Sequence, residues 1–156
     1  MSIPTIQLKL DDPVVFNPKL HSHLAASFAD VHKACITMAP YTIATFLPPL
    51  DDTRMCKWWE ERFKEVVDGH RAIIMQMAPN SATGEPELAG YVALQMPVTE
   101  TGPFRGAVEK LLVSPDHRNK GIARRLMEKL EEVAREEKRT LLVRRSKNSG
   151  KPKADL

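Results

Sequence analysis

The chain has 156 residues, of which 42% are hydrophobic and 28% are charged. This composition is typical of one globular domain with its own core, and it argues against wholesale disorder. The sequence has no apolar run long enough to cross a membrane, and its N-terminus lacks the charged start and apolar stretch of a secretory signal. We therefore expect a cytoplasmic protein without a membrane partner.

The net charge of +3 is concentrated at the end of the chain. Residues 144–156 hold five cations and one anion, whereas residues 1–143 hold 18 cations and 19 anions and sum to −1. The basic segment has no hydrophobic periodicity, so we expect a disordered tail rather than a nucleic-acid-binding face. Association with nucleic acid is a weaker alternative that only this tail suggests.

Both cysteines, Cys35 and Cys56, fall on or beside the apolar stripe of an expected helix. We interpret them as buried thiols in a reducing compartment, in preference to a disulfide or a metal site. The five histidines show no ligand spacing, and no metal is expected.

The N-terminal part of the chain predicts a short strand and then a helix. Residues 3–10 alternate apolar and polar side chains, and Pro4 places this strand at a sheet edge or delays its start. Residues 18–38 predict a helix that ends before Pro40. The apolar side chains that recur at helical spacing are Leu20, Leu24, Phe28, Val31 and Cys35.

A loop with the sequence PYTIATFLPPLDD follows at residues 40–52. Its apolar and aromatic run has no clean period and is closed by two prolines. Loops of this kind often cover binding sites, so Tyr41 and Phe46 are candidate substrate-binding residues on a lid. The alternative, in which both side chains simply fill the core, is about equally well supported.

A second helix is predicted after this loop. Asp51 and Asp52 suit its N-cap and first turn, and Gly69 suits its C-terminal stop. Trp58 and Trp59 are adjacent and cannot share one face, so one of them is expected at the edge of the apolar stripe. That stripe comprises Met55, Trp59, Phe63 and either Val66 or Val67.

The rest of the chain predicts three antiparallel strands, at 70–78, 88–98 and 104–113, a helix at 121–137 and a strand at 140–143. The last strand–helix–strand unit forms a parallel crossover. The whole order is that of an α/β sandwich, with a mixed sheet and flanking helices. The buried face of the last helix is expected to hold Ile122, Leu126, Leu130 and Val133.

The segment SPDHRNKGIARRL, residues 114–126, joins a strand to this helix. A helix N-terminus has unpaired N–H groups and about half a positive charge, and Gly121 and Ala123 leave room for a ligand. Neither common nucleotide fingerprint is present, and a solvated basic helix start is the alternative. Cations here oppose the helix dipole, and an anionic ligand would relieve that conflict. The cations are Arg118, Lys120, Arg124 and Arg125.

Residues 108–143 resemble the acetyl-CoA-binding region of the GNAT N-acetyltransferase superfamily. Arg118, Gly121 and Ala123 match its Arg/Gln-x-x-Gly-x-Gly/Ala motif, after a strand ending in LLV and at the start of a helix. Within the superfamily, the sequence is most similar to the tabtoxin-resistance acetyltransferases, which acetylate the amine of a small toxin. The resemblance implies a GNAT-like fold, acetyl-CoA as co-substrate and a small-molecule amine as acceptor.

The resemblance also implies which residues bind acetyl-CoA. N–H groups of the motif loop would hold the pyrophosphate, with Arg118 bracing the loop or touching phosphate. The splayed end of the preceding strand would pair with the pantetheine arm, and a backbone N–H there would polarise the thioester carbonyl. The residues concerned are Leu111, Leu112, Val113, Arg118, Asn119, Lys120, Gly121, Ile122, Ala123 and Arg124.

Glu109 lies two residues before the strand-end triplet, where many family members place the catalytic base. The resemblance therefore implies that Glu109 takes a proton from the substrate ammonium. Strand alternation would put Glu109 on one face with Leu111 and Val113. The alternative is a glutamate on a solvated sheet face, paired with a lysine or an arginine.

We expect residues 1–143 to form the GNAT domain. Family members continue with a helix that carries a tyrosine general acid and with two closing strands, whereas this chain continues with RRSKNSGKPKADL. The expectation is a GNAT-like fold without its last helix and closing strands, and with weak or no turnover. The alternative function is a remnant that binds CoA or a partner without catalysis, and the oligomeric state is left open.

Overall fold

The computed structural model describes residues 10–37, 50–97 and 103–144. Three predicted features lie outside these ranges, apart from Leu10 and Arg144, and stay predictions. They are the strand at 3–10, the lid residues Tyr41 and Phe46, and the tail at 144–156. The elements are β1 (Val14–Val15), α1 (Pro18–His21), the 3-10 turn η1 (Ser22–Leu24), α2 (Ala25–Thr37), α3 (Asp52–Val67), β2 (Arg71–Pro79), β3 (Pro86–Gln95), β4 (Arg105–Val113), the 3-10 turn η2 (Pro115–His117), α4 (Ile122–Glu136) and β5 (Leu141–Arg144).

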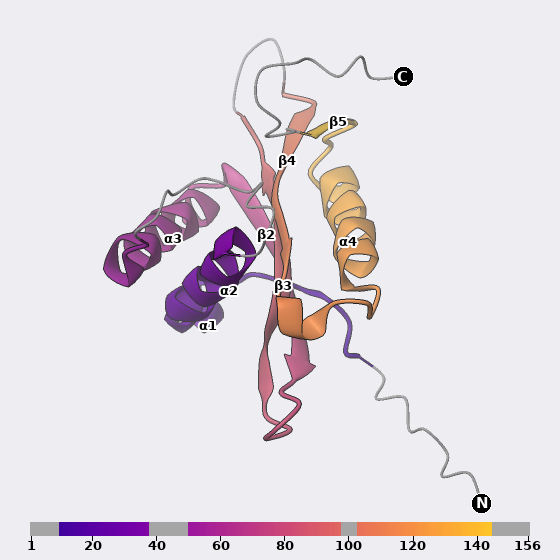
Figure 1. Ribbon diagram of the computed structural model, residues 1–156. Coiled ribbons are helices and arrows are strands. Elements are labelled where there is room, and N and C mark those ends of the chain that lie inside the picture. The colour runs from indigo at the N-terminus through magenta and orange to yellow at the C-terminus, as the bar shows by residue number, and fades with distance from the viewer. Residues whose placement is uncertain (1–9, 38–49, 98–102, 145–156) are drawn as a thin grey trace, which may run out of the picture.

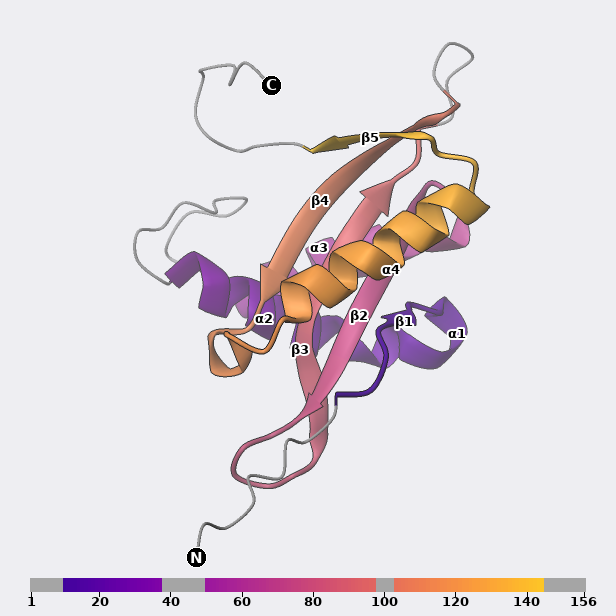
Figure 2. The ribbon, with the colours of Figure 1, turned by 90° about the vertical axis from the view of Figure 1, so that its right-hand side faces the viewer.

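The described strands form one sheet in the order β1-β2-β3-β4-β5. Neighbouring strands are antiparallel, except for the parallel pair β4 and β5. Figure 1 shows the sheet edge-on, with α1, α2 and α3 on one face and α4 on the other. Figure 2 looks onto α4, which packs over β2 and β3. The predicted hairpin, parallel crossover and α/β arrangement are confirmed.

The single helix predicted over 18–38 is wrong, because the structure breaks it between α1 and α2. Two local hydrogen bonds lie in this segment: the Asn17 N–H donates to Nδ1 of His21 at 2.8 Å at the start of α1, and the Ser22 hydroxyl donates to the Pro18 carbonyl, an acceptor of the helical ladder. Bonds of this type offer the backbone an alternative to the helical ladder. As a consequence, Leu20 is 65% exposed instead of lying on the buried stripe.

The helix α3 begins and ends where the sequence predicts. The Asp51 carboxylate accepts a hydrogen bond from the Arg54 N–H at 3.1 Å, which satisfies one of the unpaired donors of the first turn. Gly69 follows the helix with a left-handed φ of +80°. Trp58 is half-buried at the edge of the stripe, and Val67 is 68% exposed. The buried members of the stripe are Met55, Trp59 and Phe63.

The core has two layers, one on each side of the sheet. The layer under α2 and α3 is aromatic: Phe28 stacks on Tyr91 with ring centroids 4.5 Å apart, and Trp59 meets Tyr91 edge-on. The Tyr91 hydroxyl donates to the Phe28 carbonyl at 3.0 Å, so its polar group is satisfied within the core. This contact ties α2 to the middle of β3.

The layer under α4 is aliphatic. The face predicted for this helix is confirmed, because Ile122, Leu126, Leu130 and Val133 are all buried against the sheet. None of the helices among the described residues is long and apolar enough to cross a membrane.

Candidate functional site

The described residues of β4 and β5 pair over four positions. Their pairing runs from Arg105 opposite Leu141 to Val108 opposite Arg144, and the described part of the chain adds no further pairs. Farther along β4, the Ser114 N–H donates to the Ala89 carbonyl of β3 at 2.7 Å. Because backbone groups alternate in an antiparallel ladder, those of residues 111 and 113 face away from β3, toward the β5 side of the strand.

A β-bulge lies just after the part of β4 that pairs with β5. Tyr91 pairs with Leu112, but Ala93 pairs with Glu109, so two residues of β4 lie opposite one residue of β3. The extra residue is accommodated by Lys110, whose φ is +53°. A bulge bends its strand and re-aims the side chains around it.

The bulge makes the predicted face of Glu109 wrong. Leu111 and Val113 pack against the α4 side of the sheet, whereas Leu112 belongs to the core under α2 and α3. Glu109 lies on the α3 side, where Arg71 contacts it. Strict alternation would place Glu109 on the same face of the sheet as Leu111 and Val113. The extra residue at the bulge breaks this alternation, so Glu109 lies on the opposite face.

Glu109 belongs to a charged cluster on the α3 side. Arg71, which is 4% exposed, donates to Glu109 at 3.1 Å and to Glu65 of α3 at 2.6 Å. The side chain of Glu109 is 18% exposed. Cations flank the nearby ring of Trp58, with Arg62 at 4.7 Å and Lys110 at 5.4 Å from its centroid.

The pairing of Glu109 with an arginine is the arrangement that the sequence left open as the alternative to catalysis. An arginine partner does not exclude a catalytic carboxylate. Sequence reasoning missed Arg71 itself. Arg71 lies in a predominantly apolar strand, and the local sequence does not indicate that its partner is a glutamate on another strand.

The loop between β4 and α4 has the geometry of an anion site. Asn119 and Gly121 both have left-handed φ angles, +64° and +73°, and Gly121 is the N-cap of α4. No side chain caps this helix end, and its first turn holds no acidic residue. A Cβ added at Gly121 would meet no atom within 4 Å. Unpaired N–H groups and the helix dipole therefore face open space here.

The cations of this loop divide into two groups. Arg118, Lys120 and Arg124 are exposed residues of the loop and the first turn of α4, and Arg124 pairs with Glu128 of the same helix at 3.1 Å. Arg125 instead donates to the carbonyls of Leu10 and Asp11, at 3.2 and 2.9 Å, and so fastens the N-terminal segment to α4. The prediction that all four cations crowd one turn is therefore wrong for Arg125.

The end of β4 is fixed by two side chains. The carbonyl of Val113 accepts hydrogen bonds from Nε of Arg118 at 3.2 Å and from the thiol of Cys35 at 3.3 Å. This contact joins the side chain of Arg118 to the end of β4. Burial raises the pKa of the Cys35 thiol, although the hydrogen bond and the charge of Arg118 oppose this shift. Cys35 is buried as predicted, whereas Cys56 is only half-buried.

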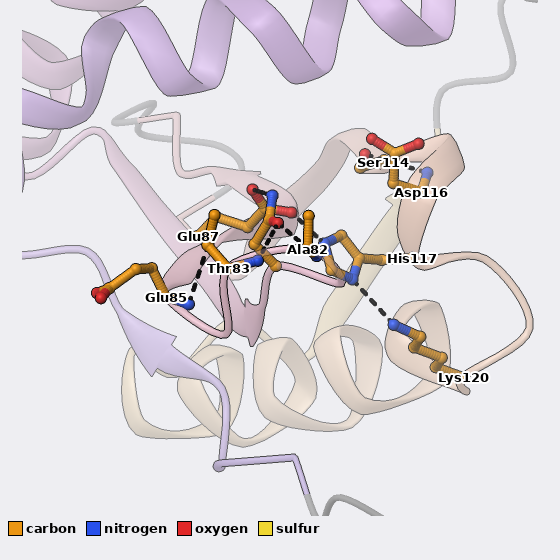
Figure 3. A network of polar contacts seen from close by, with 9 residues as sticks. Ala82, Thr83, Glu85, Glu87, Ser114, Asp116, His117 and Lys120 are labelled. Carbon is orange, nitrogen blue, oxygen red and sulfur yellow. Dashed lines mark hydrogen bonds and ion pairs between the residues drawn. The ribbon is translucent and has the colours of Figure 1, made fainter.

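A second polar network lies beneath the loop (Figure 3). The ring of His117, only 2% exposed, contacts Glu87 of β3 at 2.7 Å and Lys120 at 3.1 Å. The hydrogen bonds from Asn80 and His117 lower the pKa of Glu87. Sequence reasoning assigned no role to His117, since nothing in the local pattern indicates a partner thirty residues away.

The structure brings most of the sequence-derived site residues together. The end of β4 and the loop before α4 adjoin each other, and within the described ranges no strand pairs with this end of β4 on its β5 side. Two members contribute backbone rather than side chain, because Leu112 is 3% exposed and Ile122 is 2% exposed within the core. An extended ligand with amide groups and a phosphate end is chemically matched to this surface.

Comparisons with known proteins agree with this chemistry. Residues 38–150 match the model of the acetyltransferase (GNAT) family. The comparison with curated proteins finds no match.

Solved structures share the fold. A ribosomal-protein-alanine N-acetyltransferase from Brucella melitensis biovar Abortus is 22% identical, with a TM-score of 0.56 over 88% of this chain and 81% of that chain. A predicted acetyltransferase with acetyl-CoA from Clostridium acetobutylicum is 14% identical, with a TM-score of 0.57 over 90% and 84%. An aminoglycoside acetyltransferase from an uncultured soil metagenomic sample is 18% identical, with a TM-score of 0.58 over 91% and 82%.

Proposed function

Because this chain belongs to the GNAT acetyltransferase family, we propose that it transfers the acetyl group of acetyl-CoA to the amine of a small molecule. The observation that carries the proposal is the bulged end of β4, which has no partner on its β5 side among the described residues, beside the uncapped N-terminus of α4. One surface then offers both a strand edge for amides and an anion site for phosphates.

The residues around α4 fit the diphosphate of acetyl-CoA. Backbone N–H groups of residues 119–124 hold the two phosphates, and the space at Gly121 admits them closely. The exposed side chains of Lys120 and Arg124 add positive charge. An anion at this position also offsets the unfavourable interaction between these cations and the helix dipole.

The end of β4 fits the pantetheine arm. The amides of this arm pair with the backbone groups of Leu111 and with the N–H of Val113, because the Val113 carbonyl already accepts from Arg118 and Cys35. An N–H of this segment donates to the thioester carbonyl, and it stabilises the negative charge that develops on that oxygen during attack.

Glu109 is the proposed base. It takes a proton from the substrate ammonium, through a water molecule, and the neutral amine then attacks the thioester carbonyl. A C–N bond forms, the C–S bond breaks, and the thiolate of CoA leaves and takes up a proton. Arg71 holds the Glu109 carboxylate in place, with Glu65 as its second partner.

The acceptor class rests on sequence resemblance. The segment 108–143 is similar to acetyltransferases that act on the amine of a small toxin, and this likeness supports a small-molecule acceptor. Similar solved structures are named for different acceptors, a ribosomal protein and an aminoglycoside, so the shared fold does not select between them.

A second function is favoured by the ion pair of Glu109 with Arg71. If this pair serves only the fold, the protein binds CoA without turnover. One assay distinguishes the two functions. Purified protein is incubated with acetyl-CoA and a panel of small alkylamines, aminoglycosides and a peptide with a free N-terminal alanine, and the release of CoA thiol is measured. Amine-dependent release supports the transferase, whereas saturable CoA binding without release supports the binding protein.

A further inference from the structure

We propose that Glu87 and His117 position Lys120 for the phosphates of acetyl-CoA, so that the affinity for this ligand falls when His117 is protonated. This inference deepens the proposed function and rests on it. It concerns the hydrogen-bonded network of Glu87, His117 and Lys120 shown in Figure 3, in which Lys120 is the residue next to Gly121.

The hydrogen bonds of His117 define its tautomer. The ammonium of Lys120 has only donors, so Nδ1 of His117 accepts at 3.1 Å. In a neutral ring the proton then lies on Nε2, which donates to the Glu87 carboxylate at 2.7 Å. One neutral imidazole therefore joins an anion to a cation, and both of its nitrogens are occupied.

Glu87 is itself held from the other side. Nδ2 of Asn80 donates to its second carboxylate oxygen at 2.9 Å. Oδ1 of Asn80 accepts from the N–H groups of Ala82 and Thr83 at 2.8 and 3.0 Å, which orders the turn between β2 and β3. The low pKa of Glu87 keeps its carboxylate ionised at neutral pH. The network therefore connects an ordered hairpin turn to the residue that precedes Gly121.

The burial of His117 shows that this connection is built into the fold. The histidine is 2% exposed and lies on η2, whereas Lys120, three residues later, belongs to the exposed loop. A lysine that is free in solvent loses several rotamers when it binds an anion, and this loss weakens binding. A lysine that is already held by His117 loses fewer.

Protonation of His117 disrupts this arrangement. The ring then carries a proton on Nδ1, cannot accept from Lys120, and repels its ammonium at a distance of 3.1 Å. The contact with Glu87 is retained, because Nε2 still donates. Among the described residues, the charged groups that contact the ring are Glu87 from β3 and Lys120 from the same loop.

The test is the affinity for CoA, measured by titration calorimetry at pH 8 and pH 6. Two variants are compared with the parent: His117→Gln, which cannot gain a charge, and Lys120→Met, which keeps the length of the stem. The phosphates of CoA also titrate in this range, and every variant shares that contribution. Lys129→Met is the control, because Lys129 pairs with Glu132 farther along α4.

We expect the affinity for CoA to fall between pH 8 and pH 6 in both proteins, but by about fivefold more in the parent than in His117→Gln. This difference corresponds to the free-energy cost of ordering one side chain on binding. At pH 8, Lys120→Met should bind about 3- to 10-fold more weakly than the parent and show the same small pH effect as His117→Gln. Lys129→Met should behave as the parent. Circular dichroism establishes that each variant is folded.

Two results would overturn the inference: an equal pH effect in the parent and His117→Gln, or an unchanged affinity in Lys120→Met. If His117→Gln does not fold, Glu87→Gln replaces it. Removal of the Glu87 charge makes the protonated ring less favourable, so the loss of affinity should move to lower pH, and an unmoved profile would contradict the coupling. A parent that is folded but binds no CoA at either pH instead contradicts the proposed function.

Discussion

Arg71 of β2 reaches Glu109 of β4 across the intervening strand β3, with 3.1 Å between the guanidinium nitrogen and the carboxylate oxygen. Arg71 is 4% exposed, and its second partner is Glu65 of α3 at 2.6 Å. Through Arg71, the strand that carries the proposed base is joined to α3. We therefore expect both the stability and the proposed reactivity to depend on this contact.

Arg71→Met should destabilise the protein by about 3 kcal/mol, because it leaves two partly buried carboxylates without their shared cation. The measurement is the free energy of unfolding in urea at neutral pH. Lys33→Met is the control: its ion pair with Asp52 has the same kind of geometry, 3.0 Å, but is exposed. That change should alter stability by less than about 1 kcal/mol. Equal effects of the two substitutions would show that Arg71 contributes no more than a surface pair.

Glu109→Gln should lower the rate of acetyl transfer at neutral pH by about 10²-fold, the usual effect of a positioned base. The loss should shrink at high pH, where the amine is neutral and needs no base. Steady-state rates across a pH series measure this. Glu65→Gln is the matched control, since it removes the other carboxylate from Arg71 and should keep most of the rate. An unchanged rate in Glu109→Gln would remove this residue from the mechanism.

Gly90→Ala should destabilise the protein more than Gly106→Ala. A Cβ at Gly90 would lie 2.9 Å from the Leu112 carbonyl, which is backbone and cannot move aside easily, whereas at Gly106 the nearest atom is the end of the Leu94 side chain, at 2.8 Å. We expect Gly90→Ala to cost about 1–3 kcal/mol in urea unfolding. It should also raise the KM for acetyl-CoA, because it displaces the end of β4. A smaller effect at Gly90 than at Gly106 would contradict this packing.

The two thiols should differ in reactivity. Burial raises the pKa of both Cys35 and Cys56, so each is mostly protonated at pH 8 and should react slowly with a disulfide reagent. Cys56 should react first because it is half-buried, and in Cys56→Ser the remaining thiol should react only as the protein opens. A raised folded-state pKa also means that stability declines as the pH rises through the unfolded thiol value, about 8.5. Fast labelling of Cys56→Ser would contradict the buried position of Cys35.

Most of the fold could be predicted from the sequence, because hydrophobic periodicity and capping residues report directly on helices and strands. The aspartate that caps α3 and the apolar face of α4 illustrate this. The break between α1 and α2 could not be predicted in the same way. It depends on hydrogen bonds of Asn17, His21 and Ser22, and a stripe of apolar residues contains no information about them.

The candidate site was only partly predictable. A motif in the sequence indicated the loop around Gly121, since the glycine and its cations adjoin a strand end. The side of the sheet that Glu109 occupies depends on a bulge at Lys110, whose left-handed φ has no signature in a run of ordinary strand residues. Contacts such as those of Arg71 with Glu109 and Glu87 with His117 join residues thirty or more positions apart, and only the folded chain brings them together.

Equilibrium dialysis of acetyl-CoA tests the proposed ligand most directly, with the parent compared to Gly121→Asn and Gly121→Asp. Asparagine and aspartate have nearly the same shape and both tolerate the left-handed φ of +73° at this position, so the pair differs mainly in charge. The parent should bind saturably, Gly121→Asn should retain measurable binding, and Gly121→Asp should bind at least about tenfold more weakly than Gly121→Asn, because it places a carboxylate at the phosphate site. A folded parent without saturable binding, or equal affinities of the two variants, would contradict a phosphate site at the N-terminus of α4.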